Sequence, residues 1–463
     1  MIHQVDVRRP NPGLALAAIV AGALALRLAL APAYARLPDG YLDEWFWTSW
    51  MFAIHDRGVL NVFRMTEANY VGYQWVLWLL SLVYESIGGA YRTGDVRLHL
   101  LVKAPSIMAD LALIVVAYHA TATLAGDTTG PRRPSEARTD GMSRGQRLGL
   151  LAAAAVAVQP AVVYDSAVWA QTDAAVAAAL LASLLLLARG HPTAAWVIWA
   201  LGMSVKPQAV VILPVLALAT LQGHGPRLLI RGGGAAFATF GLILSPWMLH
   251  GDTLLLTRAY GALFGADYGR LSVSAWNTWW FVDQIAELRP NDPVVIAPFL
   301  TYRLLGLGLS AGAATLAAGY ASARRDLRGL LIAAAYLAFA FYMLPMSIHE
   351  RYLFPVLALL LPVAIADRRW MWIYAPASAT LFANMFVIAP PVEAWSGQWV
   401  DGPFIPFVAA ANVAIFLAYT TIVARGAAGE LPAAASFVRH SYPFSRIGRP
   451  SHQTPDAAVR KAA

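Results

Sequence analysis

The chain contains no cysteine, and only 13% of its 463 residues are charged. The missing cysteines exclude disulfides, thiol nucleophiles and cysteine-ligated metal ions, and they leave the redox compartment undetermined. Soluble domains carry about 25% charged residues, whereas 59% of this chain is hydrophobic. A composition with so little charge and so much apolar surface predicts a protein embedded in lipid.

Apolar stretches of membrane-spanning length recur from residue 14 to residue 424. A helix needs about 20 mostly apolar residues to cross the hydrocarbon core, so these stretches predict one all-α, polytopic bundle of transmembrane helices. Two shorter stretches meet at Lys206 and Pro207, where the proline ends one helix and begins the next. The expected spans are 14–31, 100–122, 148–164, 173–189, 193–205, 207–221, 229–249, 294–319, 329–346, 352–366, 371–389 and 403–424.

The stretch 71–88 is long enough to cross, but its glutamate and paired aromatic residues also suit a helix that lies along the interface. Charge decides between these alternatives, because basic loops remain on the cytoplasmic side. If 71–88 does not cross, the basic loops that contain Arg132, Arg227, Arg324 and Arg368 all share the side of the amino terminus. We therefore expect about twelve spans in a plasma (inner) membrane, with both termini in the cytoplasm.

This topology divides the chain into one membrane domain, residues 1–425, and a tail, residues 426–463, which its composition predicts to be disordered and cytoplasmic. Residues 32–99 are expected to form one external loop with interfacial helices, and residues 123–147 a solvated cytoplasmic loop. The net charge of +8 comes from arginines in short loops and tails rather than on one face. That distribution indicates membrane topology and no nucleic-acid partner.

An acidic pair, Asp43 and Glu44, follows the first predicted span and adjoins Trp45, Phe46 and Trp47. A carboxylate at the outer interface, shielded from water by bulky rings, has the surroundings of a general base with a raised pKa. The simpler alternative is an interfacial helix whose first turn carries acids because the helix dipole favours them there. The pair is therefore a candidate catalytic site or a membrane anchor.

Residues 164–173, YDSAVWAQTD, form a polar turn between two apolar helices. Asp165, Gln171 and Asp173 in this turn can hydrogen-bond sugar hydroxyls or hold a cation through oxygen ligands. A simple solvated turn is the alternative interpretation.

Two further motifs carry cations. Lys206 lies alone between two short spans, where it can meet a lipid phosphate or extend to the headgroups. His349, Glu350 and Arg351 are costly at membrane depth and so indicate function, and Arg351 suits bidentate phosphate binding. The alternative for this triplet is an outward loop with an internal ion pair. No second histidine follows His349 at the spacing of a zinc protease.

Trp276 and Asn277 lie in the aromatic segment SAWNTWW, residues 274–280. Such a segment can stack on sugar rings, or it can form part of an interfacial belt. Asp110 and His119 fall inside a predicted span, where we expect them to be satisfied within the helix bundle. No P-loop or dinucleotide-binding glycine motif is visible.

Taken in order, these motifs resemble those of the multispanning GT-C glycosyltransferases, and particularly bacterial relatives of the glycosylphosphatidylinositol mannosyltransferases. The resemblance rests on the acidic pair, D-S-x-x-W-x-Q-x-D, K-P-Q, S-A-W-N-T-W-W and H-E-R-Y-L-F-P, and it covers most of residues 14–390. Ala170 stands where such relatives often carry glycine, which affects the expected shape of the pocket more than the fold.

The resemblance implies a GT-C-like fold and an inverting transfer of a sugar, with mannose expected, from a polyprenyl-phosphate donor. The acceptor would be a glycan, lipid or protein at the extracytoplasmic face. Some members of the class use a divalent cation, Mg or Mn, and others use none. The resemblance therefore does not decide whether this protein uses a metal cofactor. The implied roles are base for Asp43 with Glu44 its neighbour, phosphate binding for Lys206, His349 and Arg351, and sugar or acceptor binding for Asp165, Gln171, Asp173, Trp276 and Asn277.

Two other classes of function are compatible with the same motifs. A transporter or flippase for a lipid-linked sugar would need similar cations, but it predicts polar sites near mid-membrane and on both faces. If the protein is instead a structural partner in envelope assembly, none of the external acids should matter for its function.

Overall fold

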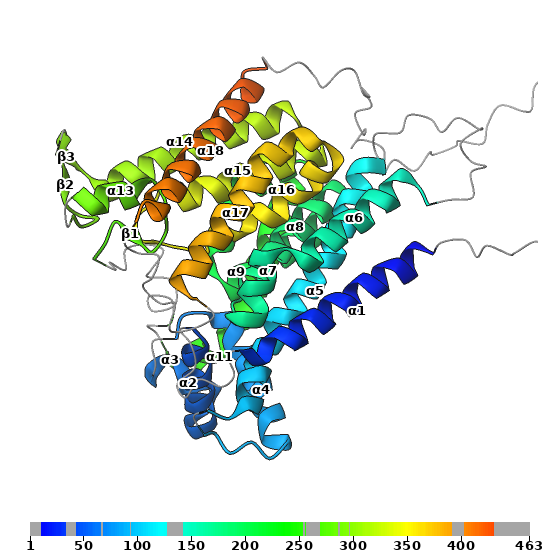
Figure 1. The fold of residues 1–463 in the computed structure, drawn as a ribbon, viewed down its shortest axis with the longest axis vertical. Helices are drawn as coiled ribbons and strands as arrows, with labels where there is room; N and C mark the ends of the chain where they lie inside the picture. Colours follow the sequence, from blue (N-terminus) through cyan, green and yellow to red (C-terminus); the bar gives the residue numbers. More distant parts are fainter. Residues whose placement is uncertain are drawn as a thin grey trace, which may run out of the picture.

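The computed structural model describes residues 11–33, 43–65, 68–92, 94–126, 142–252, 255, 269–285, 288–295, 297–390 and 402–429. Within these residues the chain is almost entirely helical, and its short strands form two two-stranded sheets. Figure 1 shows long helices running side by side, with α2, α3 and α4 gathered at the end of the molecule opposite the start of α1. The expected all-α class is confirmed.

The amino-terminal half contains long helices interrupted by short 3-10 and π turns. Its elements are α1 (Pro12–Leu30), η1 (Ala31–Ala33), α2 (Asp43–Arg57), η2 (Val59–Asn61), α3 (Val62–Met65), α4 (Val71–Ser86), α5 (Val96–Gly126), α6 (Arg144–Val158), α7 (Pro160–Val163), η4 (Tyr164–Val168), α8 (Asp173–Ala188), α9 (Pro192–Val205), η5 (Pro207–Ile212), α10 (Leu213–His224) and α11 (Pro226–Leu249).

The carboxy-terminal half adds the four short strands. Its elements are β1 (Ser272–Val273), α13 (Thr278–Ile285), β2 (Pro293–Val294), β3 (Ala297–Thr301), α14 (Tyr302–Ala323), α15 (Leu327–Met343), β4 (Ile348–His349), α16 (Phe354–Ala366), η6 (Arg368–Trp370), α17 (Met371–Ile388) and α18 (Phe404–Ala427). Strands β1 and β4 pair in parallel, and β2 pairs with β3 antiparallel.

Seven of the described helices are long and apolar enough to cross a membrane: α1, α5, η5 with α10, α11, α14, η6 with α17, and α18. Helix α6 and the following α7–η4 segment pass the same test together, although the two bend by 51° at their junction. The bend falls at Pro160, whose ring cannot continue a helix. Four shorter apolar helices are α8, α9, α15 and α16, and α4 belongs to neither group.

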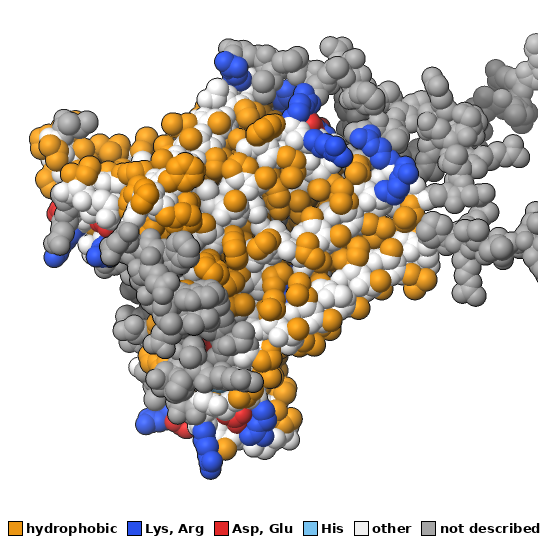
Figure 2. Space-filling view, viewed as in Figure 1, with side chains coloured by type: hydrophobic (Ala, Val, Ile, Leu, Met, Phe, Trp, Pro, Cys, Tyr) orange, Lys and Arg blue, Asp and Glu red, His pale blue; other side chains and the backbone are white. Residues whose placement is uncertain are grey.

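Large apolar side chains cover the outside of the bundle. Phe237, Leu249 and Trp372 are each more than 80% exposed, whereas soluble proteins rarely expose wide apolar surfaces. Figure 2 shows hydrophobic side chains spread across the middle of one face, with lysine and arginine side chains at its ends. An apolar band between charged ends is the surface that a bilayer requires, and the protein is membrane-embedded.

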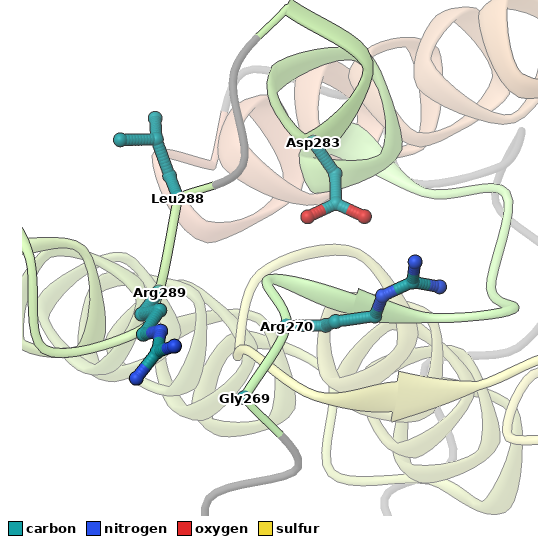
Figure 3. Close-up of a pocket in the computed structure, with 5 residues that line it drawn as sticks. All are labelled: Gly269, Arg270, Asp283, Leu288 and Arg289. Atoms are coloured by element: carbon teal, nitrogen blue, oxygen red, sulfur yellow. The ribbon is translucent and has the colours of Figure 1, made fainter.

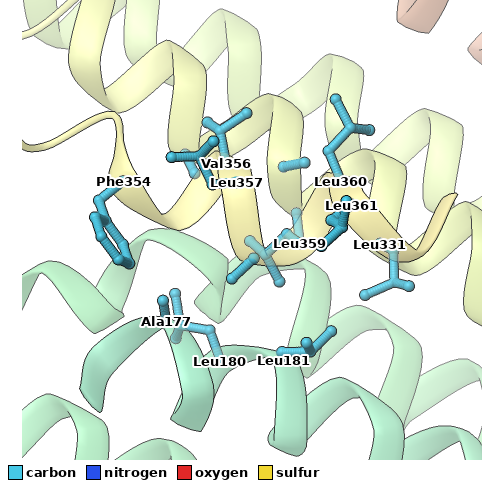
Figure 4. Close-up of a cluster of buried hydrophobic side chains, with 14 of the residues drawn as sticks. Ala177, Leu180, Leu181, Leu331, Phe354, Val356, Leu357, Leu359, Leu360 and Leu361 are labelled. Carbon is cyan, nitrogen blue, oxygen red and sulfur yellow. The ribbon is translucent and has the colours of Figure 1, made fainter. Parts of the chain in front are cut away.

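Helices α8 and α16 pack against each other in the core. Figure 4 shows Ala177, Leu180 and Leu181 of α8 beside Phe354 and Leu357 of α16, and none of these side chains is more than 3% exposed. Small residues allow helix backbones to approach closely in lipid. Because α8 begins at Asp173 and α16 begins shortly after Arg351, this packing brings two of the predicted motifs together.

Two expected segments have different boundaries in the structure. The span expected at 294–319 starts later, because β2 and β3 form a hairpin and α14 begins at Tyr302. Periodicity does not separate a short apolar strand from a helix, and Pro298 disfavours a helix there. The loop expected at 123–147 is shorter, since α5 continues to Gly126 and a capping box of Ser143 and Gln146 starts α6. The tail beyond residue 429, expected to be disordered, lies outside the described residues.

Candidate functional site

The polar turn between α7 and α8 is buried. It contains the π-turn η4, and Asp165, Gln171 and Asp173 have no exposed surface. Ala170 has a φ of 61°, in the left-handed region that costs a non-glycine residue about 1–2 kcal/mol. Backbone strain of this kind persists only where the surrounding structure enforces it, and it is common at functional sites. The solvated-turn interpretation is therefore wrong.

Lys206 is a fixed cation inside the protein. The residue before a proline avoids the helical region, and Lys206 is accordingly extended between α9 and η5. Its Nζ lies 2.8 Å from both carboxylate oxygens of Asp173, and its side chain is 1% exposed. The ammonium also lies over the rings of Tyr70 and Tyr352, 5.8 and 5.3 Å from their centroids. Lys206 does not extend to the headgroups.

The H-E-R-Y motif runs from the surface into the same region. His349 belongs to β4, and its side chain is 21% exposed, with Nδ1 3.8 Å from Oε2 of Glu350. Arg351 donates from Nη1 to Oε1 of Glu350 at 2.5 Å, and its Nε lies 3.6 Å from Oδ2 of Asp173. The Arg351 guanidinium carbon is 5.5 Å from the centre of the Trp169 ring. The motif thus reaches the turn between α7 and α8.

Glu350 keeps its charge despite being buried. Burial of the carboxyl raises its pKa, but the adjacent Arg351 guanidinium, with a smaller contribution from His349, outweighs burial and holds the pKa at about 2, below the ordinary 4.5. Glu350 lies in the segment between α15 and α16, and at neutral pH it offsets the charge of Arg351.

Five buried ionisable residues form what we call the charge cluster: Asp165, Asp173, Lys206, Glu350 and Arg351. They come from three segments far apart in the sequence, and none is more than 6% exposed. Both carboxylate oxygens of Asp165 are buried without a hydrogen-bond partner among the described residues. Because an unpartnered buried carboxylate is costly, Asp165 is the member of the charge cluster best placed to accept hydrogen bonds from a ligand.

The helix that carries the acidic pair packs against this turn. Trp47 Nε1 donates to the backbone carbonyl of Ala170 at 2.9 Å. Glu44 is buried, and its Oε1 lies 2.8 Å from Nδ1 of His99 on α5. Asp43 is the first residue of α2, one helical turn before Trp47, and its side chain lies outside the described part of the chain. The structure therefore brings α2 against the turn that carries Asp165 and Asp173.

A second buried network joins α1 and α5 to the same turn. Arg27 Nε lies 2.6 Å from Oδ2 of Asp110, and Ser166 Oγ donates to the same oxygen at 2.5 Å. All three side chains are fully buried, and Ser166 adjoins Asp165. Asp110 is thus paired inside the bundle, as expected, whereas His119 is exposed on the surface of α5.

The contacts of Trp276 and Asn277 are with α13, α15, α17 and α18 rather than with the charge cluster. Trp276 is 1% exposed and packs with Ile405 and Val408 of α18. Asn277 donates to the carbonyl of Tyr342 at 2.9 Å, and its side-chain oxygen accepts from the backbone at the start of α13. Both side chains are buried by protein in this conformation. Their segment still reaches the H-E-R-Y motif, since a bridge links residue 274 to His349.

Sequence reasoning missed Arg27 and His99. Arg27 does carry a signal, because a charge within an apolar span indicates function or a buried partner. Its partner lies 83 residues away and that of His99 lies 55 residues away, so neither pairing is readable from spacing. Among the described residues, no three His, Cys, Asp or Glu side chains gather to hold a metal ion.

The charge cluster can bind an anion and hydroxyl groups at one place. Its cations are oriented by carboxylates, and Trp169, Tyr70 and Tyr352 surround them with aromatic surface. Guanidinium and ammonium groups of this kind bind phosphate, while a carboxylate accepts hydrogen bonds from hydroxyls. Comparisons of this chain with models of known protein families and with curated proteins gave no match.

Proposed function

We propose that this protein is a membrane glycosyltransferase that moves a sugar, mannose by the resemblance of its motifs, from a polyprenyl-phosphate donor to an acceptor at the extracytoplasmic face. One observation carries the proposal: Lys206 and Arg351, from distant segments, both lie at Asp173 at the start of α8. Buried charges in a membrane protein usually mark a working site. Two fixed cations are what the leaving phosphate of such a donor requires.

Transfer breaks the bond between the anomeric carbon and the phosphate oxygen, and it forms a bond from that carbon to the acceptor oxygen. The phosphate leaves with the bonding electrons, and the acceptor proton passes to a base. We assign the base to Asp43, which follows the first span on the helix that packs against the turn at Ala170. Lys206, His349 and Arg351 would stabilise the negative charge on the departing phosphate.

Asp165 and Gln171 would bind the sugar or acceptor hydroxyls, and Asp173 takes a different role. The Asp173 carboxylate is hydrogen-bonded to Lys206 and close to Arg351, so it serves as their counter-ion. An ammonium has three N–H donors, which leaves Lys206 one donor for a phosphate oxygen. Asp165 has unpartnered oxygens in the described structure and is the better sugar ligand.

We further propose twelve spans in a plasma (inner) membrane, with both termini cytoplasmic. The seven long helices, the bent α6–α7 pair and the four shorter apolar helices supply this number if each crosses once. The short helices α8 and α16 are surrounded by protein, so they need not match the full thickness of the bilayer. Helices α2, α3 and α4 would lie at the outer surface.

Asp43→Asn is expected to abolish transfer while leaving the protein folded, because an amide cannot take the acceptor proton. Purified protein would be incubated with polyprenyl-phosphate mannose and candidate acceptors, and the release of polyprenyl phosphate would be measured. Asp56→Asn on the same helix, at an exposed position, is the matched control and should retain the wild-type rate. Arg351→Ala should require more donor for the same rate.

Full transfer by the Asp43→Asn protein would exclude Asp43 as the base. Failure of the wild-type protein to release polyprenyl phosphate would count against the transferase itself. A transporter or flippase of a lipid-linked sugar is the alternative, and the buried Arg27–Asp110 pair favours it because transporters place polar groups deep in the membrane. Donor movement across liposomes without release of polyprenyl phosphate would support that alternative.

A further inference from the structure

A polar cavity of about 240 Å³ is lined by Gly269, Arg270, Asp283, Leu288 and Arg289. Figure 3 shows Arg270 next to β1, Arg289 in the neighbouring segment, and the Asp283 carboxylate of α13 facing Arg270. Within the described part of the chain, neither guanidinium has a hydrogen-bond or ion-pair partner. Ligand pockets for larger molecules measure about 300–1,000 Å³, so this cavity suits a single small polar group.

Packed side chains and hydrogen bonds to the backbone support the residues that line the cavity. A small hydrophobic cluster of Leu271, Trp279, Val294 and Tyr302 packs among the same elements. The backbone at Arg270 is held by Ser347, whose hydroxyl donates to the Arg270 carbonyl at 2.9 Å.

The backbone at Arg289 is held by Asp292. The Arg289 amide donates to the Asp292 carboxylate at 2.7 Å, and the Asp292 amide donates back to the Arg289 carbonyl at 3.0 Å. Both arginines therefore project from anchored backbone.

Exposed apolar side chains occur on the elements that adjoin the cavity-lining segments in the chain. Ile285 at the end of α13, Val295 after β2 and Phe299 in β3 are 85%, 82% and 89% exposed. The three lie on the elements next to the two arginines, in a chain whose surface is otherwise adapted to lipid. Apolar side chains beside basic ones are the pattern of a surface that lies at the headgroup level of a bilayer.

We propose that this cavity binds the phosphate of an anionic phospholipid headgroup, with Ile285, Val295 and Phe299 against its acyl chains. Each guanidinium can donate paired hydrogen bonds to phosphate oxygens, and Asp283 can accept from headgroup hydroxyls. The bound lipid would hold the segment that leads into β1, and β1 pairs with the strand that carries His349. The inference does not depend on the proposed sugar transfer.

The test is native mass spectrometry of the full chain in detergent, titrated with dioleoyl phosphatidylglycerol or dioleoyl phosphatidylcholine. The double variant Arg270→Gln with Arg289→Gln should weaken phosphatidylglycerol binding about ten-fold or more and leave phosphatidylcholine binding unchanged. Arg324→Gln with Arg325→Gln, at the opposite end of α14, is the matched control for lost charge. Melting temperatures should match the wild type, because the substituted cavity arginines are exposed.

Phe299→Ser distinguishes a lipid from a soluble phosphate. It should weaken phosphatidylglycerol binding but not the binding of glycerol 3-phosphate, which has no acyl chains. Equal phosphatidylglycerol binding by the wild type and the double arginine variant would overturn the proposal. So would glycerol 3-phosphate binding as tight as that of the lipid, since the cavity would then be a soluble-phosphate site.

Discussion

The residues of the charge cluster differ in their hydrogen-bond and ion-pair partners. Asp173 is hydrogen-bonded to Lys206 and lies close to Arg351, whereas Asp165, eight positions earlier, has no partner for either carboxylate oxygen among the described residues. A buried ion pair is close to neutral in free energy while intact, but the loss of one partner leaves the other charge buried alone. Two aspartates in one turn should therefore respond oppositely to the same substitution.

Asp173→Asn is expected to destabilise the protein by about 3–5 kcal/mol, because it leaves the Lys206 ammonium without its carboxylate. Asp165→Asn should have little effect or should stabilise, since it replaces a buried carboxyl group that has no hydrogen-bond partner among the described residues. Thermal unfolding of both purified variants in the same detergent provides the comparison. Equal losses of stability would mean that the Lys206–Asp173 pair does not carry the difference.

Glu350 should contribute to the pH dependence of the free energy of unfolding. Its folded pKa of about 2 lies below the ordinary 4.5, so its stabilising share is complete above about 4.5 and is lost as pH falls from there toward 2. The difference in melting temperature between wild type and Glu350→Gln should shrink over that window. A difference that stays constant between pH 7 and pH 3 would contradict the assignment.

The sequence singled out the motifs that supply the charge cluster as candidates, but it did not reveal how their side chains pair. Lys206 and Arg351 stood out because cations between apolar helices are rare. That Asp173 would serve both depends on how α8 packs against α16, which no spacing along the chain reveals. The burial of Trp276 likewise follows from α18, a distant helix.

Among the elements, the turn between α7 and α8 contains a strained backbone position. Ala170 adopts a φ of 61° and accepts a hydrogen bond from Trp47. Ser274 and Ser347, which flank the paired strands β1 and β4, also have positive φ values. Three of the four non-glycine residues with positive φ in the described structure thus lie in the turn between α7 and α8 or beside the strand that carries His349; the fourth is Tyr91.

Ala170→Gly should stabilise the protein by roughly 1 kcal/mol, because glycine adopts this φ without a steric penalty. Ala174→Gly, four residues later inside α8, is the matched control and should destabilise by about 1 kcal/mol, as glycine does within helices. Chemical or thermal denaturation would measure both. A loss of stability in both variants would show that the backbone at Ala170 is not strained.

Helices were easier to predict than the connections between them. Every expected span corresponds to a helix, and the break at Pro207 is confirmed, because long apolar runs and prolines act locally. The β2–β3 hairpin was mistaken for the start of α14, since a short apolar run fits both. The π-turn contains Ser166, whose hydroxyl bonds Asp110 on α5, a partner that spacing along the chain does not reveal.

At the level of the whole molecule, the proposed topology places the end that carries the charge cluster outside the cytoplasm. The chain has no cysteine, so single cysteines can report their side without background. Ser86→Cys and Gln284→Cys, both exposed, should react with an impermeant maleimide on intact cells, while the exposed Arg144→Cys and Arg325→Cys should react only after the cells are opened. Labelling of Ser86→Cys and Gln284→Cys from opposite compartments would contradict the topology.

The Lys206–Asp173 pair also bears on how the protein enters its membrane. Helices α8 and α9 have 16 and 14 residues, fewer than the roughly 20 that a lone span needs. Asp173 begins α8 and Lys206 directly follows α9, and a lone charge resists transfer into hydrocarbon. The two helices are thus expected to insert together as a single hairpin, with the charges already neutralising each other.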